Sequence, residues 1–179
     1  IADGHIGANT LFALESAVLK AVAKEKGKEI WELINPNAKR FPRLVGNCIG
    51  GGKHSNSEKK PDFQEFLLIP KTSSPNLSFE TNKEAKANAG RILKKLDEKF
   101  EGKKNDENAW ITSFDDKKVL DVFSELKNWN KKEDIDIGVD AASSSFYSRK
   151  KYHYENPKLT RISEEHFFYI ANLIENFNL

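Results

Sequence analysis

The sequence predicts an α/β fold, in the form of a strand-and-helix barrel that this chain begins without closing. Short apolar runs typical of buried strands alternate with longer segments in which apolar residues recur at helical spacing. We find three such strand segments, whereas a closed barrel of this class has about eight. Polar residues stand at the ends of these segments, which is where barrel enzymes place their functional groups.

The composition predicts a soluble globular protein. Of the 179 residues, 31% are charged and 38% are hydrophobic, a profile typical of globular chains. The formal net charge is only +2, so no single-sign field predicts binding to nucleic acid or to a membrane surface. No apolar run approaches the roughly 20 residues that a membrane-spanning helix needs.

The chain has one cysteine, Cys48, and no methionine. A lone cysteine cannot form an internal disulfide, and together with the lack of a signal-like start it predicts a cytoplasmic setting. Because the chain opens directly on a helical pattern without methionine, we expect the natural N-terminus to lie upstream of Ile1.

Residues 7–34 carry apolar side chains at helical spacing, which predicts an amphipathic helix and a shorter second helix. We expect Asn9 or Thr10 to cap the first helix, because their side-chain oxygens can accept backbone N–H groups. We expect Gly27 to end it, since glycine readily adopts the left-handed conformation found after helices.

A connector containing Pro36 and Pro42 follows, so we expect a domain boundary near residue 41. The chain would then divide into residues 1–40, a helical domain end, and residues 41–179, the start of the barrel. The remaining predicted strands are 44–49, 63–70 and 135–142, and the last of these is expected to be buried on both faces. The remaining predicted helices are 81–100, 115–129 and 163–177, and we expect Ser163 to cap the last of them.

Two candidate groups lie around the second strand. The glycine-rich loop at 50–54 allows the backbone to approach an anion, and His54 supplies a proton carrier beside it. Strand alternation places Phe63, Glu65 and Leu67 on one side, so the Glu65 carboxylate is expected inward among apolar neighbours, next to Gln64. The structural alternatives are a solvated surface loop for His54 and a salt-bridged edge residue for Glu65.

Two further acidic spots follow. Asp106 and Glu107 stand in a loop, where a solvated turn is the simple structural explanation. Asp140 closes a predicted buried strand, a position suited to an oxygen ligand of Mg²⁺, although an aspartate that anchors a loop would also fit. Paired carboxylates near a metal-binding aspartate suit proton transfer next to a carboxylate substrate, because the metal offsets the charge of an enolate-like intermediate.

These motifs, in their order along the chain, resemble the enolase family. The resemblance covers nearly the whole chain and implies a partial enolase-type barrel, preceded by the C-terminal helices of the enolase capping domain. The matching segments are Gly7–Leu11 running into Ala23–Gly27, then Gly51–His54, then Gln64–Phe66 with Ile69 and Pro70, and finally Gly138–Asp140 with Ala142–Ser144 and Phe146–Tyr147.

The resemblance implies a Mg²⁺-dependent lyase that interconverts 2-phosphoglycerate and phosphoenolpyruvate in glycolysis. The resemblance implies that His54, Gln64 and Glu65 contact a small phosphorylated acid and that Asp140 binds the metal. It also implies a catalytic group of His54, Glu65 and Glu107, in which the two glutamates help hydroxide to leave. The family's other acidic metal ligands, its lysine base and its phosphate-binding arginine match no residue here. Residues 1–179 alone are therefore expected to lack the complete active site.

Two departures leave an alternative open. The family's Asp-Glu-Gly-Gly loop reads Asp-Glu with Asn108 and Ala109 after it, and Ser145 stands where the family commonly carries an acidic residue. These changes fit a divergent enolase or a non-catalytic, enolase-like binding or regulatory protein. The open strand edges and apolar faces of an unclosed barrel also predict a homo-oligomer, a dimer in the enolase reading.

Overall fold

The computed structural model describes residues 7–129 and 135–179. It divides into two compact units, with the division between Phe41 and Pro42. In the described residues, no helix has both the length and the apolar character needed to cross a membrane.

The first unit contains the two helices predicted from the sequence. They are α1 (Ala8–Glu25) and α2 (Ile30–Ile34). Gly27 follows α1 with a φ of +60°, which is the left-handed conformation expected after a helix end. The prediction that Gly27 ends the first helix is therefore confirmed.

The predicted helix caps are wrong. The N-cap of α1 is Gly7, so Asn9 and Thr10 lie inside the first turn instead of before it. The last helix, α5 (Ser163–Phe177), likewise begins at Ser163, and Ile162 is its N-cap. At this helix start, a side chain of the first turn reaches back to the N-cap residue: the Glu165 carboxylate accepts the Ile162 N–H at 2.9 Å.

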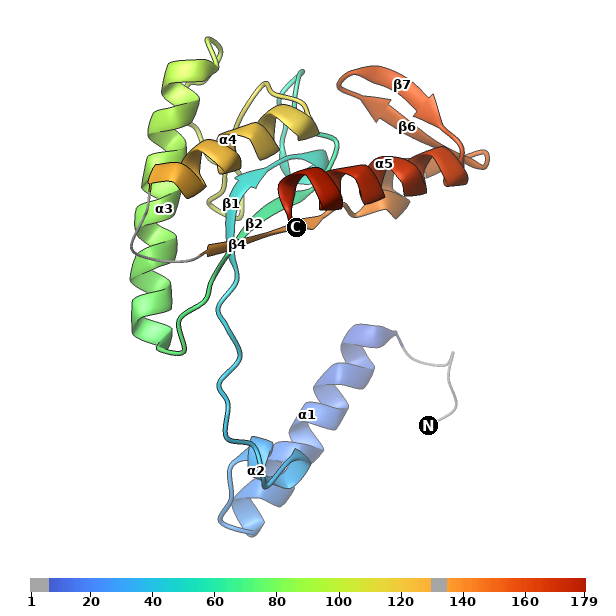
Figure 1. The fold of residues 1–179 in the computed structure, drawn as a ribbon. Coiled ribbons are helices and arrows are strands. Elements are labelled where there is room, and N and C mark those ends of the chain that lie inside the picture. Colours follow the sequence, from blue (N-terminus) through green and yellow to red (C-terminus); the bar gives the residue numbers. More distant parts are fainter. Residues whose placement is uncertain (1–6, 130–134) are drawn as a thin grey trace. The chain divides into compact units, whose positions relative to one another are not determined.

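The second unit is built on a four-stranded sheet with the order β3-β1-β2-β4. Strands β1 (Gly46–Gly50), β2 (Glu65–Pro70) and β4 (Ile135–Asp140) correspond to the three predicted strands, and β3 (Trp110–Ile111) was not predicted. β2 is antiparallel to both β1 and β4, whereas β1 and β3 are parallel. Among the described residues this sheet is open, as the sequence predicted, and does not close into a barrel (Figure 1).

Two helices, α3 (Pro75–Leu96) and α4 (Asp116–Trp129), lie side by side against the sheet (Figure 1). α3 begins before the predicted Thr81, because the Ser74 hydroxyl accepts the Leu77 N–H at 3.4 Å and Pro75 suits the first helical turn.

The core fills the space between these helices and one face of the sheet. On β2, Phe66 and Leu68 are buried, and Glu65, Leu67 and Ile69 on the other face are only partly covered. The main buried apolar residues of this core are Cys48, Ile49, Phe63, Phe66, Leu68, Ala85, Ala89, Leu93, Val119, Leu120, Val122, Phe123 and Ile137.

The prediction that Phe63 shares a side with Glu65 is wrong. β2 begins at Glu65, so Phe63 precedes the strand and its direction is not set by strand alternation. Phe63 turns into the core, whereas Glu65 lies on the half-exposed face of the sheet. The predicted fully buried strand is also wrong, because Ile137 is the one buried residue of β4 and Asp140 is exposed.

A second, three-stranded antiparallel sheet was not predicted. It is formed by β5 (Tyr147–Ser148), β6 (Lys151–Glu155) and β7 (Lys158–Arg161), and α5 contacts its last two strands. These strands are short and rich in charged residues, so they lack the apolar run by which a buried strand is found. Two short 3₁₀ helices, η1 (Gly52–His54) and η2 (Ser143–Phe146), follow β1 and β4.

Asp116 is a buried carboxyl at the start of α4. Its Oδ1 accepts the backbone N–H of Phe63 at 3.0 Å, which joins α4 to the segment before β2. Burial raises the pKa of Asp116 to about 7, and the charge of Asp62 raises it further, against the lowering effect of backbone N–H groups of Phe63 and Asp62. Asp116 therefore binds a proton more tightly in the folded state than in the unfolded state.

We predict that Asp116→Asn flattens the pH dependence of stability. The raised pKa means that the stabilisation is full below about pH 4 and is lost as the pH rises through about 7, at up to about 1.4 kcal/mol per pH unit. Urea unfolding between these limits should show the decline in the wild type and in an Asp121→Asn control on the exposed side of α4, and a smaller decline in Asp116→Asn. Equal slopes in all three proteins would contradict this assignment.

Candidate functional site

The loop after β1 brings His54 to the end of the sheet. Its two leading glycines are needed for close contact with the chain around Gln64: a Cβ on Gly51 would lie 2.4 Å from the Phe63 carbonyl oxygen, and Gly52 has a φ of +48°. The Gly51 N–H donates to the Gln64 carbonyl at 2.9 Å. The Gly52 N–H is likewise bonded within the protein, so these groups do not form the anion-binding backbone that the sequence suggested.

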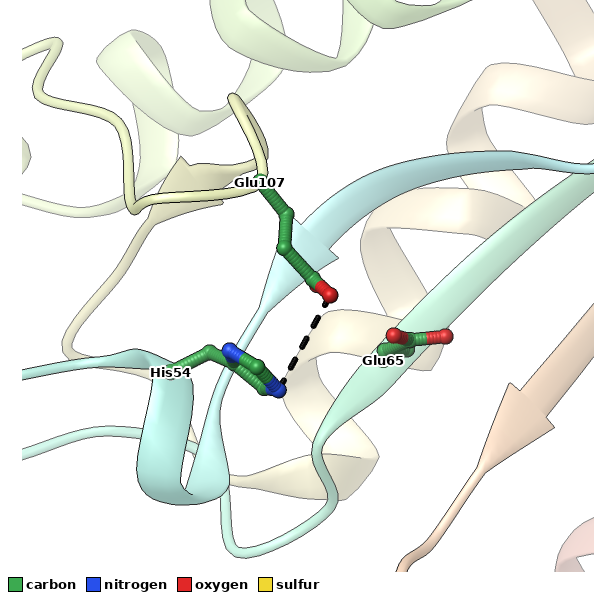
Figure 2. A group of neighbouring side chains, drawn as sticks. All are labelled: His54, Glu65 and Glu107. Atoms are coloured by element: carbon green, nitrogen blue, oxygen red, sulfur yellow. Dashed lines mark ion pairs between the residues drawn. The ribbon is translucent and has the colours of Figure 1, made fainter. Parts of the chain in front are cut away.

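Three side chains from separate segments converge at this end of the sheet (Figure 2). His54 comes from η1, Glu65 is the first residue of β2, and Glu107 comes from the loop before β3. One ligand-type atom of each lies within 4.8 Å of the other two, and His54 Nε2 is 3.8 Å from Glu107 Oε1. Asp106 joins the group from outside, with Oδ1 3.2 Å from His54 Nδ1.

The site crowds negative charge around Glu65. Partial burial raises the pKa of Glu65, the neighbouring Glu107 and Asp140 carboxylates raise it further, and His54 opposes them. The predicted salt-bridged alternative for Glu65 does not describe this environment, since its charged neighbours include two carboxylates. Glu107 is held in place separately, because Asn47 Nδ2 donates to its Oε2 at 2.8 Å.

Asp140 lies directly opposite Glu65 in the register of β4 and β2. Directly opposed residues of antiparallel strands extend their side chains on the same face, with Cβ atoms about 5 Å apart. Asp140 Oδ1 accepts the Ala142 N–H at 2.9 Å, so the carboxylate does anchor the turn after β4, as the structural alternative proposed. The same contact orients the exposed carboxylate at the end of the sheet that carries Glu65.

Gln64 connects these segments through its backbone. Its N–H donates to the Asp140 carbonyl at 3.1 Å, and its carbonyl accepts the Gly51 N–H. This arrangement places Gln64 beside both the His54 loop and the β4 end. The predicted role of its side chain in substrate binding stays a prediction.

Asn105, which was not predicted as part of the site, shapes the loop that carries Glu107. Its Oδ1 accepts the backbone N–H groups of Glu107 at 3.1 Å and Ala109 at 2.8 Å. An asparagine two residues before a candidate functional residue is a recognisable turn signal, because its side chain can bond to the backbone just after it.

A second cluster that was not predicted surrounds His166 of α5. Its Nδ1 lies 2.7 Å from the Tyr154 hydroxyl, its Nε2 lies 3.2 Å from Ser143 Oγ, and the Tyr152 ring stacks on it at 3.7 Å between centroids. Burial lowers the pKa of His166, and Arg161 lowers it further. The neutral imidazole thus joins the turn after Asp140 to the second sheet, a long-range contact that no local pattern indicates.

The carboxylates of this site fit a hard divalent cation. Asp140 presents an oriented, exposed carboxylate beside Glu65, and oxygen ligands of this kind suit Mg²⁺. Burial is the main cause of the raised pKa of Glu65, and the repulsion from Glu107 and Asp140 that adds to it is charge crowding that a nearby cation would relieve. Among the described residues, the group close enough together to share an ion is His54, Glu65 and Glu107, and Asp140, opposite Glu65, adds an exposed carboxylate beside it.

Comparison with known proteins shows which family this chain resembles. A family model described as "Enolase, C-terminal TIM barrel domain" matches residues 39–177. Enolase from Pyrobaculum aerophilum is 36% identical over 180 residues, covering 97% of this chain and 42% of that protein. The enolases of Natronomonas pharaonis and Methanosphaera stadtmanae are 33% and 32% identical, and the match covers 44% and 43% of their lengths. The chain thus spans less than half the length of these relatives.

We predict that His166→Ala destabilises the second unit by about 2–4 kcal/mol, because it removes a stacked ring and the hydrogen bond between that ring and the buried Tyr154 hydroxyl. Urea unfolding followed by tyrosine fluorescence would measure this change. His153→Ala is the matched control, since His153 lies exposed on β6, between the two tyrosines that contact His166, and its loss should cost less than about 0.5 kcal/mol. Similar losses in the two variants would show that the His166 contacts add nothing specific.

Proposed function

The chain belongs to the enolase family, and we propose that the full-length protein is a Mg²⁺-dependent lyase that converts 2-phosphoglycerate to phosphoenolpyruvate and water. The observation that carries this proposal is the convergence of His54, Glu65 and Glu107 from three segments, with Asp140 opposite Glu65. A structural surface cluster would not need three separate loops and strands to meet at one sheet end.

The metal would be held by Asp140 together with ligands that match no residue of this chain. When bound, Mg²⁺ supplies positive charge that stabilises the enolate-like form of the substrate carboxylate. Asp140 is suited to this role by its position, since the Ala142 N–H fixes the direction of its carboxylate.

The paired glutamates act on the leaving group. A base that matches no residue of this chain takes the proton on the carbon next to the carboxylate, and the electron pair of that C–H bond moves into the carboxylate to give its enolate-like form. That pair then forms the new carbon–carbon double bond as the C–O bond breaks. Glu107, assisted by Glu65, gives a proton to the departing hydroxide, which leaves as water. Their position beside each other supports this shared role.

His54 is proposed to lie near the substrate phosphate, with Gln64 lining the same pocket. His54 is held on one side by Asp106 and faces Glu107 on the other, so it can donate to an anion without leaving the site. The proposal includes a glycolytic role in the cytoplasm and assembly as a homo-oligomer, a dimer by the family resemblance.

The competing proposal is a non-catalytic, enolase-like binding or regulatory protein, which the departures at Asn108, Ala109 and Ser145 motivated. The geometry supports the catalytic proposal at the first two positions. Asn108 adopts a φ of +63°, which asparagine tolerates, and Ala109 is buried without a positive φ. Metal-ligating carboxylates and lysines in the rest of the full-length sequence would count against the competing proposal.

We predict that full-length protein with Mg²⁺ forms phosphoenolpyruvate from 2-phosphoglycerate, as followed by the ultraviolet absorbance of the product. Glu107→Gln, Glu65→Gln and Asp140→Asn should each lower kcat by about 10²–10⁴, because each removes a proton-transfer group or the metal ligand. Glu101→Gln, an exposed change earlier in the same loop, is the control and should keep wild-type activity. A folded wild type without turnover would refute the catalytic proposal.

A further inference from the structure

We propose that Asn105 is the residue that positions Glu107, and that it can do so because Gly50 has no side chain. This inference deepens the proposed function and rests on it, since it concerns the group that we assign to hydroxide departure. Neither residue touches the reacting groups, so both act through the loop that carries Glu107.

Asn105 holds the loop that carries Glu107 through both its side chain and its backbone. Its Oδ1 accepts the N–H groups of Glu107 and Ala109, at 3.1 and 2.8 Å. Its own N–H donates to the Ala109 carbonyl at 2.9 Å, and its carbonyl accepts the Asn108 N–H at 3.0 Å. Four hydrogen bonds therefore connect Asn105 to Glu107 and to the two residues that follow it.

These bonds matter because the loop lacks the two glycines of the family pattern. Asn108 takes the left-handed conformation that the turn requires, with a φ of +63°, and its carbonyl accepts a hydrogen bond from the Lys86 ammonium. The Ala109 side chain is fully buried, so this end of the loop is packed into the protein. The loop is thus held in one shape by contacts, where a glycine pair would leave more conformational freedom.

Gly50 leaves the space that Asn105 occupies. A Cβ added to Gly50 would lie 2.3 Å from Asn105 Nδ2 and 3.4 Å from Ala109 Cβ. The Gly50 backbone does not have a positive φ, so glycine is required here for space alone. Gly50 ends β1 and pairs with Glu65 on one side and Ile111 on the other, which puts the Asn105 amide over the strand end beside the site.

The amide nitrogen of Asn105 supports this packing role. Nδ2 is buried and has no hydrogen-bond partner in the described residues, so the amide is held there by its oxygen and by its close fit over Gly50. Asn47, on the same strand β1, donates to Glu107 Oε2 at 2.8 Å. β1 therefore positions both the backbone of Glu107, through Gly50 and Asn105, and its carboxylate, through Asn47.

The first test removes the acceptor. In full-length Asn105→Ala, amide hydrogen exchange measured by NMR should show lost protection at Glu107 and Ala109, and kcat should fall about tenfold to a hundredfold with little change in KM. Asn105→Asp keeps an oxygen in the same place and should retain protection at both amides. Asn76→Ala, an exposed change in α3, is the matched control and should alter neither readout.

The second test uses the close contact between Gly50 and the Asn105 amide. Gly50→Ala should lower kcat in the wild-type background, because the new methyl group displaces the Asn105 amide. Added to Asn105→Ala it should cost much less, since the atom it would meet is gone. Such non-additivity is expected of residues in direct contact and would not arise if the two changes acted independently.

Unchanged amide protection in Asn105→Ala, or strictly additive losses in the double variant, would overturn the proposal. If Asn105→Ala does not fold, the contrast between Asn105→Asp and Gly50→Ala decides, because only the latter should lose protection at Glu107. The exchange measurement also separates this inference from the proposed function. A protein without turnover would refute the enolase activity, yet protection that depends on the Asn105 oxygen would still support its positioning of Glu107.

Discussion

The antiparallel register between β2 and β4 is the constraint on which the site depends. It sets Glu65 opposite Asp140, and the hydrogen bond from the Gln64 N–H to the Asp140 carbonyl extends the pairing by one residue beyond β2. A shift of one residue would turn one of the two carboxylates to the other face of the sheet. The register is fixed by the core, because Phe66, Leu68 and Ile137 must all face α3 and α4.

His54 and Glu107 are brought to the Glu65–Asp140 pair by loop contacts and not by strand pairing. His54 reaches it through two glycines that let its loop lie against the backbone before β2. Glu107 reaches it through a loop built around Asn105 and through the amide of Asn47. The buried sheet thus supplies the fixed carboxylates, and two loops bonded to its end supply the histidine and the second glutamate. A site built in this way keeps its functional side chains on half-exposed surfaces while their supports are buried.

Much of this arrangement can be predicted from the sequence, for reasons that are local. Apolar runs identify β1, β2 and β4, and helical spacing identifies α1, α3 and α4. The face on which Glu65 lies could not be predicted, because it depends on where β2 begins, and strand ends are not marked by composition. The contacts of Asn105 with Gly50 and of His166 with Ser143 join residues distant in sequence, so no pattern along the chain indicates them. The short strands β5 to β7 lack apolar runs and are stabilised by α5, which follows them.

The central claim is that Asp140, Glu65 and Glu107 serve one metal-assisted reaction at one sheet end. A crystal structure of the full-length protein with Mg²⁺ and 2-phosphoglycerate tests it most directly. The account predicts an Asp140 oxygen about 2.1 Å from the ion, with the Glu107 and Glu65 carboxylates facing the substrate hydroxyl that departs. A magnesium ion bound without Asp140, or a substrate hydroxyl turned away from both glutamates, would contradict it.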